Sequence, residues 1–327
     1  MPRPRRVAIV GGGIAGLTLA AALPSCVEVT LHEAQPERAT GAALGLWPAA
    51  VRALGRVGVD LPPPAPPGRA GLFGVDGRRR LHLATPALTL LERPDLMAAL
   101  EAAVPARVTR VHQEVEDPTA LDADLVVGAD GVRSQVRGLV QRADRVATPW
   151  VALRGLAGPA DPAEVGEYWG PDRLFGLVPL DARRSYWFTT HRSDLGPEPL
   201  EVPEVLAQAR TRFGGDCATI RRHLETADDR ILATRIWTVP ALRRYARERY
   251  VVVGDAAHAS TPNLGRGATD AVLDATSLAA TLTGHGSLLR WQAARLPATR
   301  ASALGAAALM RLATRPRTRP RPAREGG

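Results

Sequence analysis

The sequence predicts an α/β protein in which a domain built on a parallel sheet is interrupted by a second, mostly antiparallel sheet domain. Three observations support this fold class. A glycine-rich turn follows an apolar strand near the start of the chain, two later apolar strands each run into glycine and aspartate, and the region between those two strands consists of alternating, aromatic-rich segments. A chain of 327 residues is long enough to bury the cores of two such domains.

The first motif is a strand at 7–10 that runs into Gly11, Gly13 and Gly16 of a GxGxxG pattern. Gly11 allows a tight turn, Gly13 lets the backbone approach a pyrophosphate, and Gly16 lets the following helix pack closely on the sheet. Glu33 ends the second strand, about twenty residues further on, where a carboxylate accepts hydrogen bonds from ribose hydroxyls. Because a strand, a helix and an acid surround the glycines, a dinucleotide site is favoured over a glycine turn that binds nothing.

Two further motifs follow apolar strands at 124–128 and 250–254. The first, GADGVRS, places Asp130 after its strand, and the second, GDAAH, places Asp255 after the other. Taken singly, each is also compatible with an ordinary turn. Since the carboxyl ends of strands in an open α/β sheet face the ligand crevice, we expect both aspartates at one ligand site. A helix that opens at 265–268 would offer its N–H groups to the same ligand.

The middle of the chain has a different character. Alternating segments such as 150–153, 174–178 and 185–190 predict a largely antiparallel sheet. The resulting division assigns a discontinuous cofactor domain to 1–70, 92–148 and 240–285, a substrate-binding sheet domain to 71–91 and 149–239, a C-terminal helix to 286–314, and a disordered arginine- and proline-rich tail to 315–327.

Charge and composition argue against several classes of function. The net charge is +9, and the basic tail supplies much of it, so we expect no specific nucleic-acid partner; nonspecific attraction of the tail to RNA or lipid is the alternative. Cys26 and Cys217 fit neither a metal site nor a disulfide framework. The sequence has no run of roughly eighteen apolar residues, which predicts a cytoplasmic protein without a membrane span.

The three motifs in this order resemble the class A FAD-dependent aromatic hydroxylases, the flavoprotein monooxygenases built like 4-hydroxybenzoate hydroxylase. The resemblance spans nearly the whole chain. Segments 45–50 and 92–96 are similar to the family's segment before a helix and to its Arg-x-x-Leu motif, and segments 168–170 and 186–188 are similar to the sheet of its urate and salicylate hydroxylase members.

The resemblance implies a Rossmann-type FAD-binding domain and a set of cofactor contacts. Glu33 would bind the adenosine ribose, Arg93 the flavin side chain, Asp130 the pyrophosphate, and Asp255 the ribityl chain or the pyrophosphate, while Pro262 would lie beside the flavin ring. The implied cofactor-binding residues are Gly11, Gly13, Ala15, Gly16, Glu33, Arg93, Asp130, Asp255, Gly265, Gly267 and Ala268.

The resemblance also implies the reaction. Such an enzyme uses NADH or NADPH and O₂ to hydroxylate a small aromatic or heteroaromatic substrate through a flavin C4a-hydroperoxide. The chemistry is then centred on the flavin, and no side chain is assigned as general base. A flat substrate suits an aromatic pocket, for which Trp169, Phe175, Tyr186 and Trp187 are the candidates.

Three positions depart from the family pattern and leave alternatives open. Ala49 stands where Asn is frequent, Arg266 where Gln is common, and Thr269 where Asn or Cys is usual. FAD binding tolerates such changes more readily than efficient hydroxylation does. The alternatives are therefore another FAD-dependent oxidoreductase, such as an oxidase, epoxidase or reductase, or a flavin-binding homologue with impaired catalysis.

Overall fold

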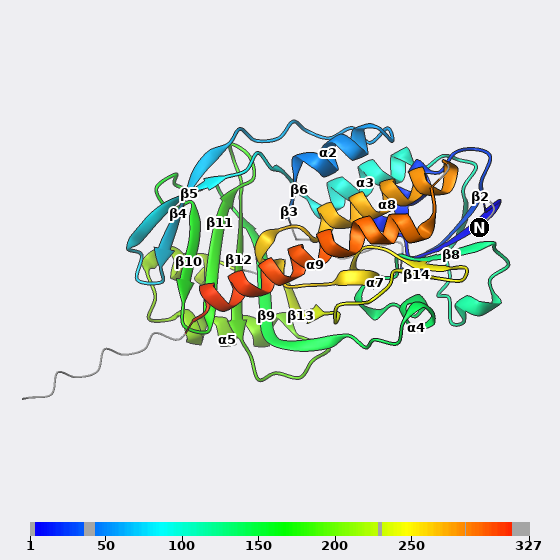
Figure 1. Cartoon of the computed structure of the whole chain (residues 1–327). Coiled ribbons are helices and arrows are strands. Elements are labelled where there is room, and N and C mark those ends of the chain that lie inside the picture. The colour runs from blue at the N-terminus through cyan, green and yellow to red at the C-terminus, as the bar shows by residue number, and fades with distance from the viewer. Residues whose placement is uncertain (1–3, 36–42, 228–230, 285, 316–327) are drawn as a thin grey trace, which may run out of the picture.

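The computed structural model of this chain describes residues 4–35, 43–227, 231–284 and 286–315. Apart from Arg315, the tail expected at 315–327 lies outside the described residues. Figure 1 shows two sheet regions side by side, with the helices of the first on the right and a broad sheet on the left. None of the helices within the described ranges is long and apolar enough to cross a membrane.

A six-stranded sheet forms the first region, in the order β14-β15-β8-β1-β2-β7. All neighbouring strands are parallel except β14, which pairs antiparallel with β15. The strands β15, β8 and β1 are short and apolar because both of their faces are buried, whereas the edge strands β14 and β7 are more exposed. Their bounds are β1 (Arg6–Val10), β2 (Glu28–His32), β7 (Thr109–Val111), β8 (Leu125–Gly128), β14 (Ala246–Arg247) and β15 (Tyr250–Val252).

Helices cover this sheet and a two-stranded ribbon adjoins it. Helix α1 packs on both α3 and α8, α2 packs on α8, and α4 contacts β15. The ribbon pairs β3 with β6 in antiparallel register. The bounds are α1 (Ile14–Ala22), β3 (Ala43–Leu46), α2 (Pro48–Gly55), β6 (Thr89–Glu92), α3 (Arg93–Ala103), α4 (Val136–Val140), α7 (Asp255–His258) and α8 (Gly267–Thr283), with short 3-10 turns at η1 (Pro118–Ala120), η2 (Gly131–Arg133) and η3 (Pro262–Leu264).

A seven-stranded sheet forms the second region, in the order β13-β9-β12-β11-β10-β4-β5. Every neighbouring pair is antiparallel except β10 and β4, so the predicted fold class of a parallel domain interrupted by a mostly antiparallel sheet is confirmed. The bounds are β4 (Gly68–Gly74), β5 (Arg79–Thr85), β9 (Val146–Ala157), β10 (Gly166–Gly170), β11 (Arg173–Pro179), β12 (Ser185–Arg192) and β13 (Leu232–Thr238).

The two faces of this sheet are covered differently. Helices α5 (Val202–Phe213) and α6 (Ala218–Glu225) pack on one face and form a core with it. The other face, which we call the inner face, receives Met310 and Ala313 from the end of α9 (Leu288–Ala313). In Figure 1, α9 runs across the front from the parallel region to the seven-stranded sheet, so it joins the two regions.

Candidate cofactor and substrate site

The glycine loop after β1 leaves an opening at one position only. Gly11 has φ +102, and a Cβ there would lie 2.4 Å from the carbonyl oxygen of Ala129. A Cβ on Gly16 would lie 1.9 Å from the carbonyl oxygen of Gly11. A Cβ on Gly13 would meet nothing within 4 Å. Gly11 and Gly16 are thus required by close backbone packing, whereas Gly13 borders open space of the kind a diphosphate needs.

The start of α1 suits a negatively charged group. Gly13 is its N-cap, and the described helix has neither a side-chain cap nor an acidic residue in its first turn. Its first N–H groups and the positive end of its dipole therefore remain available to an anion. Ala15 lies in this first turn, and a Cβ built on Gly254 would lie 3.2 Å from the Ala15 Cβ, so the loop after β15 packs against the same helix end. Together with the contact between Gly11 and Ala129, this brings all three sequence motifs to one sheet edge.

Glu33 is oriented toward the glycine loop. Its Oε2 accepts a hydrogen bond from the Gly12 N–H at 2.6 Å, and its Oε1 accepts one from the Gln35 N–H at 2.8 Å. The carboxylate is thus fixed beside the opening at Gly13, at the end of β2. That position suits contact with the hydroxyls of a ribose attached to a bound diphosphate.

One carboxylate oxygen of Asp130 has no hydrogen-bond partner among the residues that the structure describes. Its Oδ2 accepts a hydrogen bond from the Gln135 N–H at 2.8 Å, while its Oδ1 is buried with no hydrogen bond among the described residues. Burial raises the pKa of Asp130, against backbone hydrogen bonds from Gln135 and Val136 that lower it. Because buried polar atoms are nearly always hydrogen-bonded, Oδ1 is positioned to take a donor from a ligand.

The loop after β15 is held by a buried ionic network. Asp274 is fully buried, and its Oδ2 contacts His258 Nε2 at 2.6 Å and accepts the Gly254 N–H at 3.0 Å, while its Oδ1 accepts from Arg295 Nε at 2.6 Å. Burial lowers the pKa of His258, but the charge and hydrogen bond of Asp274, together with the charges of Asp255 and Asp270, outweigh it and the net shift is upward. Since the network fixes Gly254 at φ +60, it presents the exposed Asp255 at the sheet edge.

The loop before α8 contains further unsatisfied polar atoms. Trp47 Nε1, Thr261 Oγ1 and Asn263 Oδ1 are buried without hydrogen bonds among the described residues. The Trp47 N–H donates to Thr269 Oγ1 at 3.0 Å, and the Arg266 guanidinium lies 5.3 Å from the centre of the Trp47 ring. These groups therefore border one region at the start of α8. A flavin ring, which carries both hydrogen-bond donors and acceptors at its edge, fits such a set.

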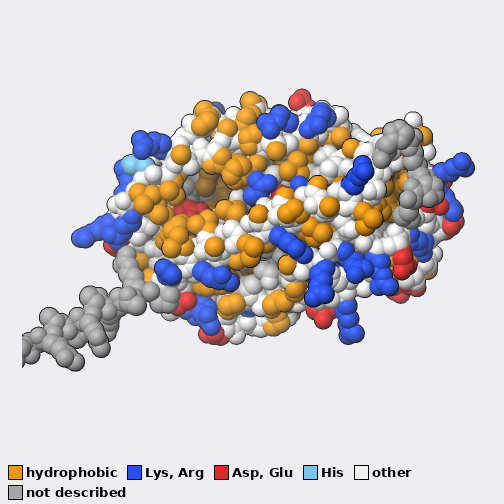
Figure 2. Space-filling model, viewed as in Figure 1, with side chains coloured by type: hydrophobic (Ala, Val, Ile, Leu, Met, Phe, Trp, Pro, Cys, Tyr) orange, Lys and Arg blue, Asp and Glu red, His pale blue; other side chains and the backbone are white. Residues whose placement is uncertain are grey.

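The inner face of the seven-stranded sheet supplies an aromatic wall. Trp169 and Phe188 belong to the cluster that meets the end of α9, and the Tyr186 and Phe188 ring centres are 5.7 Å apart. Figure 2 shows a hollow over this side of the molecule, rimmed by hydrophobic side chains with acidic atoms inside. A flat substrate between this wall and the cofactor loops would be shielded from water.

Two of the four predicted pocket residues lie on the opposite face, and here the prediction is wrong. Phe175 and Trp187 are at most 2% exposed and belong to the core formed with α5 and α6. Side chains alternate between the faces of a strand, so Trp187 points away from the face that carries Tyr186 and Phe188. Trp169 and Tyr186 lie on the inner face, and their place in a substrate pocket stays a prediction.

Comparison with known proteins establishes the family. The family described as FAD binding domain matches residues 94–296. The chain is 31% identical over 345 residues to 3-amino-4-hydroxybenzoate 2-monooxygenase of Streptomyces cremeus, covering 91% of this chain and 84% of that protein. The chain belongs to the class A FAD-dependent aromatic hydroxylases. It is a flavoprotein monooxygenase whose cofactor is FAD and whose co-substrate is NADH or NADPH, as the sequence predicts.

Other relatives agree with this assignment. This monooxygenase is 29% identical over 327 residues to an aurachin C monooxygenase/isomerase of Stigmatella aurantiaca, covering 89% of this chain and 85% of that protein. The fold matches that of Klebsiella pneumoniae HpxO complexed with FAD and uric acid, with a TM-score of 0.81 at 21% identity over 95% of this chain and 89% of that one.

The departures from the family pattern have structural partners in this monooxygenase. Arg266 donates from Nη2 to Asp270 Oδ1 at 2.9 Å and from Nε to Ser302 Oγ at 3.0 Å, and Thr269 accepts the Trp47 N–H. Ala49 is half-buried in the first turn of α2. Arg266 and Thr269 therefore help to build the loop beside the proposed flavin position rather than disrupt it.

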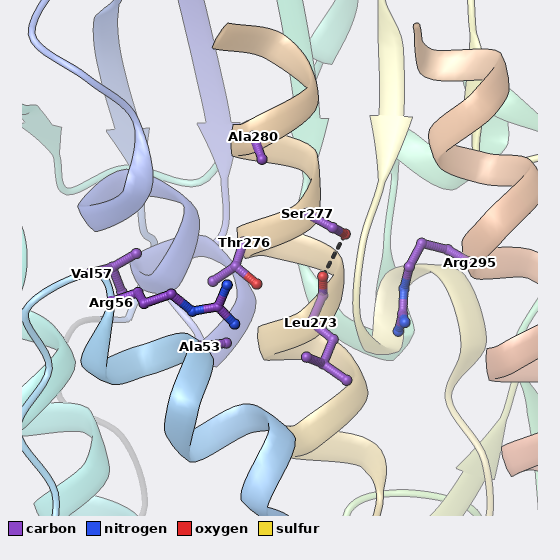
Figure 3. A pocket seen from close by; sticks show the side chains of 8 residues that line it. All are labelled: Ala53, Arg56, Val57, Leu273, Thr276, Ser277, Ala280 and Arg295. Carbon is purple, nitrogen blue, oxygen red and sulfur yellow. Dashed lines mark hydrogen bonds between the residues drawn. The ribbon is translucent and has the colours of Figure 1, made fainter. Parts of the chain in front are cut away.

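Arg93 begins α3 directly after the β3–β6 ribbon, and its role toward the flavin side chain stays a prediction. A cavity of about 430 Å³ lies between α2, α8 and α9 (Figure 3). Its α8 lining begins at Leu273, more than a turn beyond Gly267 at the start of the helix, so it is separate from the cofactor loops. Its lining residues are Ala53, Arg56, Val57, Leu273, Thr276, Ser277, Ala280 and Arg295.

Proposed function

We propose that this monooxygenase hydroxylates a small aromatic or heteroaromatic substrate held between the inner face of the seven-stranded sheet and an FAD bound at the three loops. The observation that carries the proposal is the convergence of these loops around polar atoms that lack protein partners. In particular, Gly13 borders open space and Asp130 Oδ1 is buried without a hydrogen bond in the described structure.

We assign the cofactor contacts from this geometry. The N–H groups at the start of α1 bind the diphosphate beside Gly13, and Ala15 and Gly16 keep that helix end close to the sheet. Glu33 binds the adenosine ribose, and Asp130 and Asp255 accept hydrogen bonds from hydroxyls or water along the cofactor. From the family resemblance we add Arg93, Pro262, Gly265, Gly267 and Ala268 as further contacts of the FAD.

The protein's own part in the reaction is to hold, orient and shield. When bound, FAD takes a hydride from NAD(P)H and activates O₂ for transfer of one oxygen atom to the substrate. Trp169, Tyr186 and Phe188 orient the substrate ring and keep water from the reacting atoms. Trp47, Thr261 and Asn263 offer their unsatisfied polar atoms to the edge of the flavin ring.

The names of the relatives suggest substrates for a first test. They act on 3-amino-4-hydroxybenzoate, or make a 3-hydroxy-4(1H)-quinolone or modify aurachin C. The purified protein should show the absorption bands of bound flavin and oxidise NADH or NADPH faster when such a compound is added, with matching O₂ consumption and a hydroxylated product. Reduced-cofactor oxidation that releases only H₂O₂ with every compound would contradict hydroxylation and favour an oxidase.

A further inference from the structure

One row of the inner face carries two opposite charges. Glu167 on β10 is in register with Gly176 on β11, Gly176 with Phe188 on β12, and Phe188 with Arg154 on β9. Paired residues on neighbouring strands point to the same face. With strands about 4.8 Å apart, the backbones of Glu167 and Arg154 are separated by roughly 14 Å. Because both side chains extend inward, this distance suits a small flat molecule placed between them.

Glu167 is an unusual group for this wall. It is a half-buried carboxylate that lies between Gly166 and Tyr168 in the sequence of β10. Burial raises its pKa, despite a hydrogen bond from Trp169 that lowers it. Trp169 Nε1 donates to Glu167 Oε2 at 2.7 Å. Oε1 has no hydrogen bond within the described part of the chain. The Trp169 bond therefore fixes the carboxylate and leaves one oxygen for a donor from a ligand.

The middle of the row forms a flat apolar floor. A Cβ on Gly176 would lie 2.2 Å from Cζ of Phe188, so the Phe188 ring lies over the β11 backbone, where only a glycine leaves room. The Tyr186 ring lies beside it. An aromatic ring that stacks here has its two ends directed toward Glu167 on one side and Arg154 on the other.

The end of the row at Arg154 favours a hydrogen-bond acceptor on the substrate. Arg154 Nη1 donates to Thr234 Oγ1 at 2.5 Å, and its remaining guanidinium N–H groups are donors only. The positive charge also acts on Tyr186: burial raises the pKa of this phenol and Arg154 lowers it. A carbonyl or carboxylate on the substrate would satisfy Arg154 at this end, whereas a carboxylate beside Glu167 would be repelled.

We propose that Glu167 and Arg154 are the two poles of the substrate site, and that the substrate is a flat aromatic with an N–H or O–H donor at one end and a carbonyl or carboxylate acceptor at the other. This inference rests on the proposed function, because it places the substrate on the inner face. It adds the specificity-determining residues and the chemical class that they select.

The test measures ligand binding to the FAD-loaded enzyme, from the change that the ligand causes in the flavin spectrum. The probes are 4(1H)-quinolone, which has an N–H opposite its carbonyl, and 1-methyl-4-quinolone, which lacks that donor. We expect the wild-type enzyme to bind the first probe about ten- to a hundredfold more tightly, the value of a hydrogen bond to a charged group. Glu167→Leu should abolish this preference, and Glu167→Gln, which keeps a neutral acceptor, should retain part of it.

The matched control is Glu164→Gln. Glu164 accepts hydrogen bonds from Thr219 and Arg222 of α6, on the other side of the sheet, so this variant loses a nearby carboxylate without touching the inner face. It should keep the full preference for the N–H probe. Arg154→Gln is the reciprocal test: it should weaken binding of 3-amino-4-hydroxybenzoate about tenfold or more, while 2-aminophenol, which lacks the carboxylate, should be affected little.

Two outcomes overturn the proposal. One is a wild-type enzyme that does not distinguish the two quinolones, and the other is a Glu167→Leu variant that keeps the preference while its flavin content and circular dichroism match the wild type. If Glu167→Leu fails to fold, Glu167→Gln decides: an unchanged N–H preference in that variant, together with unchanged binding of 3-amino-4-hydroxybenzoate by Arg154→Gln, sinks the two-pole site. The proposed function fails by a separate measurement, namely absence of FAD binding or of substrate-dependent O₂ consumption.

Discussion

The cofactor loops and the seven-stranded sheet differ in what carries their function. In the loops, backbone geometry does most of the work: Gly11 and Gly16 permit close contacts, and Gly13 borders the opening. In the sheet, side chains form the site, and the role of each one depends on the face to which it points. Trp187 and Phe188 are neighbours in sequence, yet one lies in the core under α5 and α6 and the other on the inner face. A backbone site is thus specified locally, whereas a side-chain site is specified by packing.

The sharpest test of the backbone site compares two glycines of one motif. Gly16→Ala should cause the largest effect, a loss of about 4 kcal/mol or more in the free energy of unfolding, because the added Cβ would lie 1.9 Å from a backbone oxygen that cannot move freely. Denaturant unfolding of the FAD-free protein measures it. Gly13→Ala should leave that stability nearly unchanged, because its Cβ meets nothing within 4 Å, yet weaken FAD binding by roughly tenfold or more. Equal stability losses in the two variants would show that Gly13 is structural.

The buried network behind the loop offers the next largest effect. Asp274→Asn removes a fully buried charge that faces Arg295 and His258, and we expect a loss of about 3–5 kcal/mol in unfolding free energy. Asp255→Asn is the control on the same loop. Because Asp255 is exposed, the unfolding free energy of this variant should hardly change, and its affinity for FAD should fall instead. A mild effect of Asp274→Asn would mean that the network does not hold the loop.

Two phenylalanine substitutions, one on each face, test the roles of the two faces of the seven-stranded sheet. Phe175→Ala empties a fully buried site and should cost about 3 kcal/mol of stability, while the folded fraction binds substrate normally. Phe188→Ala should cost less stability because this ring is only half-buried, and should weaken substrate binding instead. Thermal unfolding and ligand titration, run on both variants, check this division. Similar losses of ligand affinity in both would argue against assigning the pocket to one face.

Glu33 provides a smaller test of the backbone site. Glu33→Gln keeps an acceptor for the Gly12 N–H but removes the charge that strengthens hydrogen bonds from a ribose, so the FAD dissociation constant should rise about tenfold. Flavin fluorescence during titration of the FAD-free protein measures it. Val29→Ala, in the strand before it, is a control that lowers stability without removing a ligand contact.

The smallest effect is a dependence of stability on pH. The pKa of His258 is raised above its ordinary value of 6.5 in the folded protein, so its pairing with Asp274 stabilises fully below pH 6.5 and is lost as pH rises through the folded-state pKa. The pKa of Asp274 is lowered, so the stability it contributes is lost only as pH falls through that lowered value. Unfolding free energies should therefore decline above about pH 6.5 in the wild type, and His258→Gln should remove that decline. A wild-type profile that rises over this range would contradict the pairing.

The cofactor region is specified by short local stretches of the chain. The glycines, Glu33, Asp130 and Asp255 stand at strand ends, and the covalent spacing of a strand, a turn and a helix fixes where such residues lie. The family, the fold class and FAD follow from these local patterns, because the requirement for positive φ at Gly11 or for open space at Gly13 is written into a few consecutive residues.

The substrate region, in contrast, depends on how distant segments pack. Alternation places neighbouring residues of one strand on opposite faces, but whether Phe175 shares a face with Trp169 depends on the register of β10 with β11. That register, and the choice of face covered by α5 and α6, depend on contacts between distant segments. Glu167 is an acidic residue among the apolar residues of β10, and this exception is visible in the sequence. The pocket prediction follows the aromatic residues around it instead. The pairing of Glu167 in a row with Arg154 exists only once four strands have been assembled, because side chains far apart in the chain share a face through backbone hydrogen bonds that the chain forms on folding.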